Sequence, residues 1–503
     1  CLMYNSRIMK PDLLPDHRTA SDIDRIVNRA LKAARVPGAA IAVVAGDQTY
    51  IKGYGVKVTG EPDPVTERTV FAVASVTKAF TTALLALLVG ENVLSWDDPV
   101  RKHLPEFRLS DPLADANVTL RDLVSHRTGM PRHDMLWYRA PWDRAELIRR
   151  FAHAAPNKGF RETYQYQNIC FTVAGEAAAR AAGAASFEEL LQDRLLKPLQ
   201  MTATTLSTTD AEVDPDHATP HRRDKQKRLE VMPWRNLDNA GPCGSVNSCA
   251  LDMVNWLRFQ LSGGVNPHTG EALVAAEALK QTHIPQTVIP EEEEFTLHYP
   301  DSVQRSYGMG WTILDYRGGH KMVRHGGVLG GFRAHVSLLP REGIGVAVML
   351  NAQTWLAEPL ANSLIDYLAG LPEKNWIGEY DAQSRKDTEK EKTKKKEKEA
   401  GRHRGTRPSL KLPEYAGTYQ HPAYGDVAVT LSETGRTLCL SWSAWSNYPL
   451  RHWHHDVFVT DDTEPDFADQ EVVFALNPKG EIASLTLFEN VFMRRPANTG
   501  TSA

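Results

Sequence analysis

The chain has few of the features that mark several large classes of protein. Its 503 residues carry a formal net charge of −4 at pH 7, so it lacks the strongly basic footprint of a nucleic-acid-binding protein. The cysteines are few and scattered, which argues against a disulfide framework, and they are Cys1, Cys170, Cys243, Cys249 and Cys439. Cys243 and Cys249 are candidates for a pair, whereas Cys170 and Cys439 stand in apolar segments and are expected to be buried.

Long apolar runs are also missing. The longest, around residues 79–89, is shorter than the roughly 20 residues that a membrane-spanning helix needs, so no membrane span is predicted. Residues 1–10 lack the apolar core of a signal peptide, which with the unpaired cysteines favours a cytoplasmic location. The histidines at 452, 454 and 455 have no complementary ligand pair at a recognisable spacing. No metal and no cofactor are therefore predicted.

Apolar residues are plentiful, at 42% of the chain, which is enough for a large core and more than one domain. The patterns predict a helix, a hairpin, and much later a second antiparallel pair and a last helix, at residues 21–35, 39–55, 332–351 and 356–371. Apolar helices lie between the two groups of strands. We therefore predict an α+β fold in which one antiparallel sheet, assembled from both ends of the segment, is flanked by helices and carries an all-helical region.

A charged run separates this part from the rest of the chain. Residues 390–398 are nearly all Lys and Glu, which favours a solvated linker or exposed helix over a basic docking tail. Five short alternating strands then predict a small all-β sandwich or barrel, and they lie at residues 427–431, 438–442, 456–460, 472–476 and 484–488. The predicted divisions are an N-terminal extension, a first domain, a charged linker, a β domain and a tail, at residues 1–20, 21–375, 376–411, 412–496 and 497–503.

A serine and a lysine three residues apart stand at the start of the most apolar predicted helix. Ser75 is placed to cap this helix and Lys78 lies one turn on, so the two side chains can touch. A helix N-terminus stabilises developing negative charge by about 0.3–1 kcal/mol when it is exposed, which suits a serine nucleophile. A Ser-x-x-Lys sequence arises by chance about once or twice in a chain of this length, so an ordinary capped core helix is the alternative.

Tyr166 and Asn168 precede an apolar helix that is expected to begin at Ile169. A tyrosine close to a lysine can accept and return a proton, and an amide two residues on can bind a substrate carbonyl. Tyr164 is a competing candidate for the same role. The alternative is an aromatic loop that packs over the core.

A histidine followed by two glycines, His325-Gly326-Gly327, leads through Val328 into the strand predicted near residue 332. Paired glycines allow the backbone to approach a ligand closely, and the backbone N–H of Val328 is a candidate for half of an oxyanion hole. A turn histidine that is satisfied by its neighbours is the alternative.

In this order, the three motifs resemble those of the serine β-lactamase-like family, which includes class C β-lactamases, penicillin-binding proteins, esterases and D-peptidases. The family signatures are Ser-x-x-Lys, Tyr-x-Asn and a Lys-Thr-Gly-like strand motif, which many esterases and peptidases replace with His-x-Gly. The similarity covers roughly residues 21–371 and includes the segments 71–74, 119–131 and 241–252. The tail, with Tyr415 to Tyr419, resembles the lipocalin-like barrel appended to some members.

The resemblance implies a transpeptidase-like fold and an acyl-enzyme. Ser75 would be the nucleophile, with Lys78 and Tyr166 as the base pair, and which of the two takes the serine proton stays open. The backbone N–H groups of Ser75 and Val328 would form the oxyanion hole. The substrate-binding residues would be Asn168, His325, Gly326 and Gly327.

The third motif departs from that of true β-lactamases. His325 is an imidazole, largely neutral at pH 7, where a lysine usually meets the substrate carboxylate, so an ester, thioester or small amide is preferred to penicillin. We expect an esterase-like hydrolase of small molecules. The alternatives are an acyltransferase, a D-aminopeptidase or β-lactamase, and a non-enzymatic scaffold or acylation sensor. A homo-oligomer through the C-terminal domain is a further expectation.

Overall fold

The computed structural model describes residues 17–224, 226, 228–291, 299, 302–461 and 467–496. Internal packing divides the chain into two compact units. The first holds the described residues up to Arg132 and those of Ala155–Gln383, and the second holds His133–Ala154 and the described residues from Ser384 onward. Residues 1–16 and the predicted tail lie outside the described residues, and the domain limits drawn from the sequence remain predictions.

An eight-stranded antiparallel sheet forms the centre of the first unit, in the order β2-β1-β12-β11-β10-β9-β8-β7. Its strands are β1 (Gly38–Ala45), β2 (Gln48–Gly55), β7 (Thr287–Val288), β8 (Arg305–Tyr307), β9 (Thr312–Tyr316), β10 (His320–Leu329), β11 (Phe332–Leu339) and β12 (Ile344–Leu350). The early strand β1 pairs with the late strand β12, with Ile41 opposite Val348. This confirms the predicted α+β class and the assembly of one sheet from both ends of the segment.

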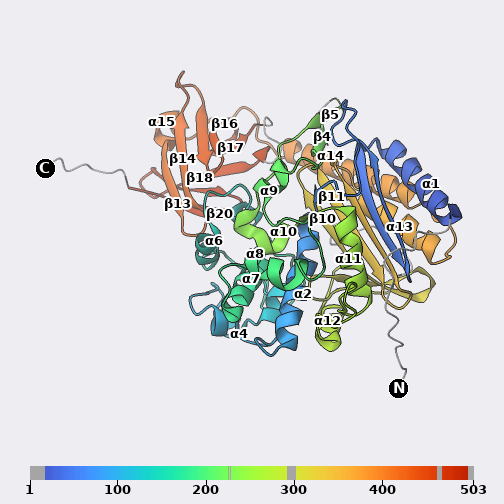
Figure 1. Cartoon of the computed structure of the whole chain (residues 1–503). Helices are drawn as coiled ribbons and strands as arrows, with labels where there is room; N and C mark the ends of the chain where they lie inside the picture. The colour runs from blue at the N-terminus through green and yellow to red at the C-terminus, as the bar shows by residue number, and fades with distance from the viewer. Residues whose placement is uncertain are drawn as a thin grey trace. The chain divides into compact units, whose positions relative to one another are not determined.

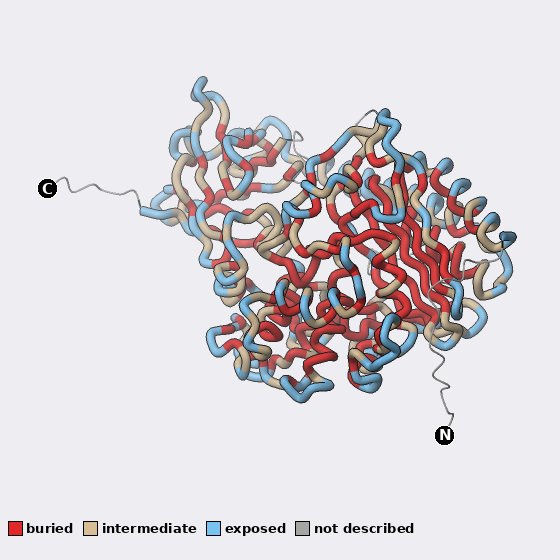
Figure 2. Tube along the Cα trace, viewed as in Figure 1, coloured by how far each residue is buried: buried red, intermediate tan, exposed pale blue. Residues whose placement is uncertain are grey.

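Helices cover both faces of this sheet (Figure 1). Ile41, Val346 and Val348 pack in one core with α1 (His17–Ala34) and α13 (Ala357–Leu368). The opposite face meets α11 (Ala250–Leu261), where a Cβ on Gly345 would come within 3.1 Å of Leu261. Successive residues of the central strands are buried, as Figure 2 shows. Because successive residues of a strand face opposite sides of the sheet, both faces of the sheet are covered there.

The inserted region is helical, as predicted. Its helices are α2 (Thr77–Gly90), α3 (Val100–His103), α4 (Pro112–Asn117), α5 (Leu120–Val124), α7 (Asn168–Ala182), α8 (Phe187–Leu191), α9 (Thr208–Val213), α10 (Gly241–Gly244) and α12 (Ala276–Thr282). The α2 helix is apolar on all sides and is buried from Thr77 to Leu88, with α7, α10 and α12 packed against it. It is therefore a rigid support for the residues at its N-terminus.

The second unit is a closed eight-stranded barrel. Its strands are β13 (Gly417–His421), β14 (Gly425–Leu431), β15 (Leu438–Trp442), β16 (Trp445–His454), β17 (Val457–Thr460), β18 (Glu471–Leu476), β19 (Ile482–Leu487) and β20 (Asn490–Arg494). The segment His133–Ala154, which contains α6 (Arg144–Phe151), belongs to this unit. In it, Arg150 Nη1 donates to the Ala423 carbonyl at 3.2 Å, and the Arg139 carbonyl accepts from Ser443 Oγ at 2.6 Å.

The charged stretch is a helix over most of its length, α14 (Trp376–Ala400). Four cysteines fall within the described residues; all are buried and free, so Cys243 and Cys249 do not form the pair considered from the sequence. Among the described residues, no helix is both long and apolar enough to cross a membrane.

Candidate active site

Ser75 lies in a tight turn between β3 (Phe71–Ala72) and α2. The turn is a 3₁₀ segment, η1 (Ala74–Val76), and the N-cap of α2 is Val76, so the predicted capping role of Ser75 is wrong. Ala74 has a φ of +49°, a left-handed conformation that L-residues other than Asn, Asp and His rarely adopt. The strained turn leaves Ser75 half-buried at the surface of an otherwise buried segment.

The segment around residues 242–246 holds the serine turn in place through hydrogen bonds. Val73 N–H donates to the Val246 carbonyl at 3.1 Å, and Val246 N–H donates to Thr77 Oγ1 at 3.0 Å. Thr81 Oγ1 donates to the Pro242 carbonyl at 2.6 Å, one turn further along α2. These bonds hold both the strained turn and the first turns of α2 in place.

Lys78 is fully buried, and its Nζ lies within hydrogen-bond distance of three oxygens. Nζ lies 3.2 Å from Ser75 Oγ, 2.8 Å from Asn168 Oδ1 and 3.0 Å from the Cys243 carbonyl. None of the three acceptors is a carboxylate. The lysine is thus oriented toward the serine by neutral oxygens.

Tyr166 lies beside Lys78, at the entry to α7. The centre of its ring is 4.8 Å from Lys78 Nζ, and the side chain is half-buried. Asn168 is the first residue of α7, and its Oδ1 accepts a hydrogen bond from Lys78 Nζ. The competing Tyr164 is buried, with its ring against those of His126 and Tyr307 at 5.6 Å.

His325 lies within β10, not in a loop ahead of the strand. Its Nδ1 donates to the Gly326 carbonyl at 2.7 Å, which leaves Nε2 to accept from the Tyr307 hydroxyl at 3.0 Å. Burial lowers the pKa of His325 to about 3, with the positive charge of Lys78 as the second cause. The imidazole is therefore neutral, and the centre of its ring lies 6.4 Å from that of Tyr166.

Gly327 brings β10 against the serine turn. A Cβ on Gly327 would lie 2.0 Å from the Val73 carbonyl oxygen, so glycine is needed there for contact with the serine turn. The expected role of Gly327 in the approach of a ligand stays a prediction. At Gly326 the nearest atom to such a Cβ is His335 Nδ1 at 3.4 Å, an ordinary contact. The two glycines of the motif therefore have different physical roles.

Val328, the next residue, has a backbone N–H that neither neighbouring strand uses. The two-residue turn after Leu329 makes Leu329 and Phe332 a hydrogen-bonded pair, so Val328 and Arg333 form a non-hydrogen-bonded pair and the N–H of Val328 points away from β11. On the other side, the pairing of β10 with β9 ends at Arg324. This donor lies one residue from the contact with the serine turn.

Two residues of this neighbourhood were not candidates from the sequence. His126 has its ring centre 4.3 Å from that of Tyr166, and Tyr307 binds His325. His126 belongs to the segment 119–131, which was noted only by resemblance, and Tyr307 carries no motif at all. Among the described residues, no group of three or more His, Cys, Asp or Glu is arranged to hold a metal ion.

Comparisons with known proteins cover most of the chain. Unguisins hydrolase ungD of Aspergillus violaceofuscus is 28% identical over 452 residues, which span 82% of this chain and 76% of that protein. Protein flp of Staphylococcus aureus is 24% identical over 347 residues, or 68% of this chain and 65% of that one.

Solved structures share the fold. The octameric penicillin-binding protein homologue from Pyrococcus abyssi has a TM-score of 0.61 at 21% identity, covering 94% of this chain and 99% of that one. A class C beta-lactamase mutant has a TM-score of 0.57 at 18% identity, covering 70% of this chain and 97% of that one. Residues 401–499 match a domain of unknown function, DUF3471, and residues 23–369 match the family model described as Beta-lactamase. The chain belongs to the beta-lactamase family.

Proposed function

We propose that the protein is a serine hydrolase that forms an acyl-enzyme on Ser75, with carboxylic esters as its favoured substrates. The observation that carries this proposal is the position of Lys78, whose Nζ joins Ser75 Oγ at 3.2 Å to Asn168 Oδ1 at 2.8 Å. A nucleophile, a base held within reach of it and a third group that orients the base are what acyl transfer requires. The name of the relative unguisins hydrolase agrees with hydrolysis as the reaction class.

In the proposed reaction, Ser75 Oγ attacks the carbonyl carbon of the substrate while its proton passes to Lys78 or Tyr166. The tetrahedral oxyanion accepts hydrogen bonds from the N–H groups of Ser75 and Val328, and one such donor is worth on the order of 10²–10³ in kcat. Tyr166 then returns the proton to the leaving group. Water then attacks the acyl carbon and gives a proton to the same base, and the bond between the acyl carbon and Ser75 Oγ breaks as Oγ takes that proton back, which releases the acid.

The state of His325 supports an ester over a penicillin. Both of its ring nitrogens are engaged, by Gly326 and Tyr307, and the low pKa of about 3 keeps the ring uncharged. A charged donor for a substrate carboxylate is therefore absent at the position where β-lactamases usually present a lysine. Amides stay as the second substrate class, since the acyl-enzyme chemistry is common to both.

The test is labelling by a fluorophosphonate probe, followed by turnover of p-nitrophenyl esters, D-amino-acid p-nitroanilides and nitrocefin. We expect the wild-type protein to be labelled and to hydrolyse the esters fastest. Ser75→Ala should abolish labelling, whereas Ser432→Ala, a change in the barrel, should leave it intact. Persistent labelling of the Ser75→Ala variant overturns the nucleophile, and stoichiometric labelling without turnover of any of the three substrates overturns the hydrolase.

A further inference from the structure

His126 holds the chain on both sides of Tyr166. Its backbone carbonyl accepts from the N–H of Gln165 at 2.8 Å, and its side-chain Nδ1 accepts from the N–H of Gln167 at 3.0 Å. Tyr166 is the residue between these two donors. The position of its backbone is therefore set by one residue, which comes from a different part of the chain.

The imidazole of His126 also packs against the ring of Tyr166. The two ring centres are 4.3 Å apart with an interplanar angle of 35°, and the ring centre of Tyr307 lies 4.5 Å from that of His126. His126 is completely buried. Its ring therefore packs directly against that of Tyr166 and restricts the movement of the tyrosine ring on that side.

His126 keeps two features that are unfavourable for folding. Its φ of +58° is left-handed. Because Nδ1 accepts a hydrogen bond, the ring proton must lie on Nε2, and this buried nitrogen has no hydrogen-bond partner. Burial, and next the positive charge of Lys78, lower the pKa of His126 well below 6.5, so Nδ1 stays an acceptor at neutral pH. Such costs accumulate where a residue has a task beyond folding.

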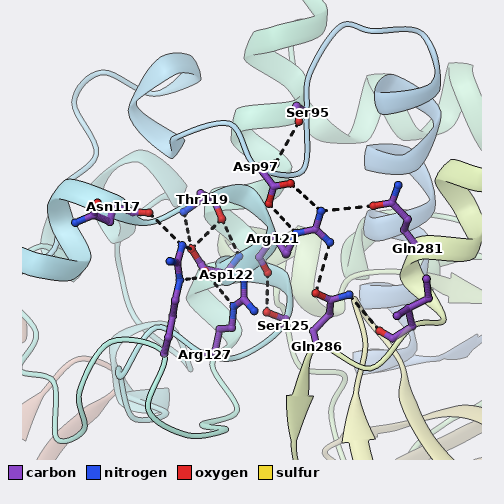
Figure 3. A network of polar contacts seen from close by, with 12 residues as sticks. Ser95, Asp97, Asn117, Thr119, Arg121, Asp122, Ser125, Arg127, Gln281 and Gln286 are labelled. Carbon is purple, nitrogen blue, oxygen red and sulfur yellow. Dashed lines mark hydrogen bonds and ion pairs between the residues drawn. The ribbon is translucent and has the colours of Figure 1, made fainter.

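A buried carboxylate fixes the two segments that meet at His126. Asp122 accepts from Arg127 Nε at 2.6 Å and from Arg161 Nη2 at 2.7 Å, and Arg161 N–H donates to the Arg127 carbonyl at 2.9 Å. Figure 3 shows Asp122 between Thr119 and Arg127, with Thr119 completing its set of donors. The chain that carries His126 and the chain that leads to Tyr166 are thus tied to one rigid point.

From this arrangement we propose that His126 is the positioning residue of Tyr166, and that its Nδ1, which accepts from Gln167 N–H, keeps the phenol ring beside Lys78. The inference rests on the proposed role of Tyr166 in proton transfer. His126 itself exchanges no proton and touches no reacting atom. A misplacement of the tyrosine by about 1 Å would cost on the order of 10²-fold in rate.

The experiment compares three substitutions by ester hydrolysis, with kcat expressed per active site titrated by fluorophosphonate. His126→Phe keeps an aromatic ring but removes the acceptor Nδ1. His126→Gly is compatible with the left-handed backbone but removes both the ring and the acceptor. His126→Asn keeps an acceptor near the position of Nδ1 and tolerates the same backbone. We expect kcat to fall about 10²-fold in the Phe and Gly variants with little change in KM, and to stay near the wild-type value in the Asn variant.

A merely structural histidine would reduce the yield of active protein but not kcat per titrated site. Wild-type kcat in the Gly variant, or an Asn variant as impaired as the other two, overturns the proposal. The double variant gives a second readout. If His126 acts through Tyr166, His126→Gly should cause no further loss of kcat in a Tyr166→Phe background. A full additional loss of kcat in the double variant also overturns the proposal. If Tyr166→Phe alone retains wild-type kcat, the proposed function has failed, not the positioning role.

Discussion

The Tyr307 hydroxyl donates a hydrogen bond of 3.0 Å to Nε2 of His325. Because Nδ1 of the same ring donates to the Gly326 carbonyl, His325 has no ring donor left over. Its place in the strand matches that of the third motif, yet its chemistry differs from that of a lysine. Tyr307, which lies in the strand β8, thereby fixes which ring nitrogen of His325 carries the proton.

Tyr307→Phe should free Nε2 of His325 and leave it as an unsatisfied buried acceptor. We expect a loss of about 1–3 kcal/mol in the free energy of unfolding, measured by urea denaturation. Since the neutral ring then has no second partner to fix its orientation, substrate preference in the panel of esters and nitrocefin should broaden. An unchanged free energy of unfolding would show that the hydrogen bond contributes nothing net.

Gly327→Ala should separate β10 from the serine turn. A Cβ there would lie 2.0 Å from the Val73 carbonyl oxygen, so either the turn or the strand must move, and with it the N–H of Val328. We expect kcat for ester hydrolysis to fall about 10²-fold or more, since oxyanion donors act at fixed distances. Gly401→Ala is the control outside the site, because the nearest atom to a Cβ there is the Glu397 carbonyl oxygen at 3.5 Å, an ordinary contact. Equal activities of the two variants would contradict this account of the motif.

Asp122→Asn should destabilise the protein far more than Asp97→Asn. The Asp122 side chain is fully buried and bound to two arginines, whereas that of Asp97 is 66% exposed and bound to Arg121. Both carboxylates appear in Figure 3. We expect a loss of about 2–3 kcal/mol for Asp122, reduced by the exposure of its arginines, and about 1 kcal/mol or less for Asp97. Urea denaturation measures both free energies of unfolding. Equal losses would show that the buried ion pairs of Asp122 stabilise the protein no more than the exposed pair of Asp97.

Stability should fall as the pH drops below about 6.5. Among the described residues of the first unit, burial lowers the pKa values of five histidines: to about 3 for His283 and His325, well below 6.5 for His126 and His335, and below 6.5 for His221. The unfolded chain takes up these protons first, so the stabilisation is complete above the unfolded pKa and is lost as the pH falls.

Each such histidine contributes a slope of at most about 1.4 kcal/mol per pH unit below its unfolded pKa. Urea denaturation between pH 6.5 and 5 isolates them, because carboxylates in the unfolded chain titrate lower, near 4. A free energy of unfolding that is flat or rises as the pH falls through this window would contradict the burial of neutral histidines.

Local patterns were sufficient to predict much of the fold. The strands near residues 40, 50, 335 and 346 and the helix α2 depend on apolar runs and turn residues that the sequence shows directly. In the barrel, β14, β15, β17, β18 and β19 were predicted, and β13, β16 and β20 were not. β16 contains Pro449 and Arg451 and reads as a loop, because its strand character depends on partners on both sides.

Parts of the site depend on contacts that no local pattern reveals. The proximity of Lys78 to Ser75 follows from their spacing, but the contact of Lys78 with Asn168 is made by the fold. His126 reaches Gln167 across two segments, and Tyr307 reaches His325 across two strands. The reason for glycine at 327 is a carbonyl oxygen more than 200 residues earlier in the chain, at Val73.

The most direct test of the central claim is mass spectrometry of the protein mixed briefly with a p-nitrophenyl ester and quenched in acid. We expect one acyl group per chain, carried by the peptide that contains Ser75, and no acyl group in the Ser75→Ala variant. The adduct should persist longer in Tyr166→Phe, since deacylation would lose its proton carrier. An acyl group on a different residue, or steady ester turnover by Ser75→Ala, would contradict the account.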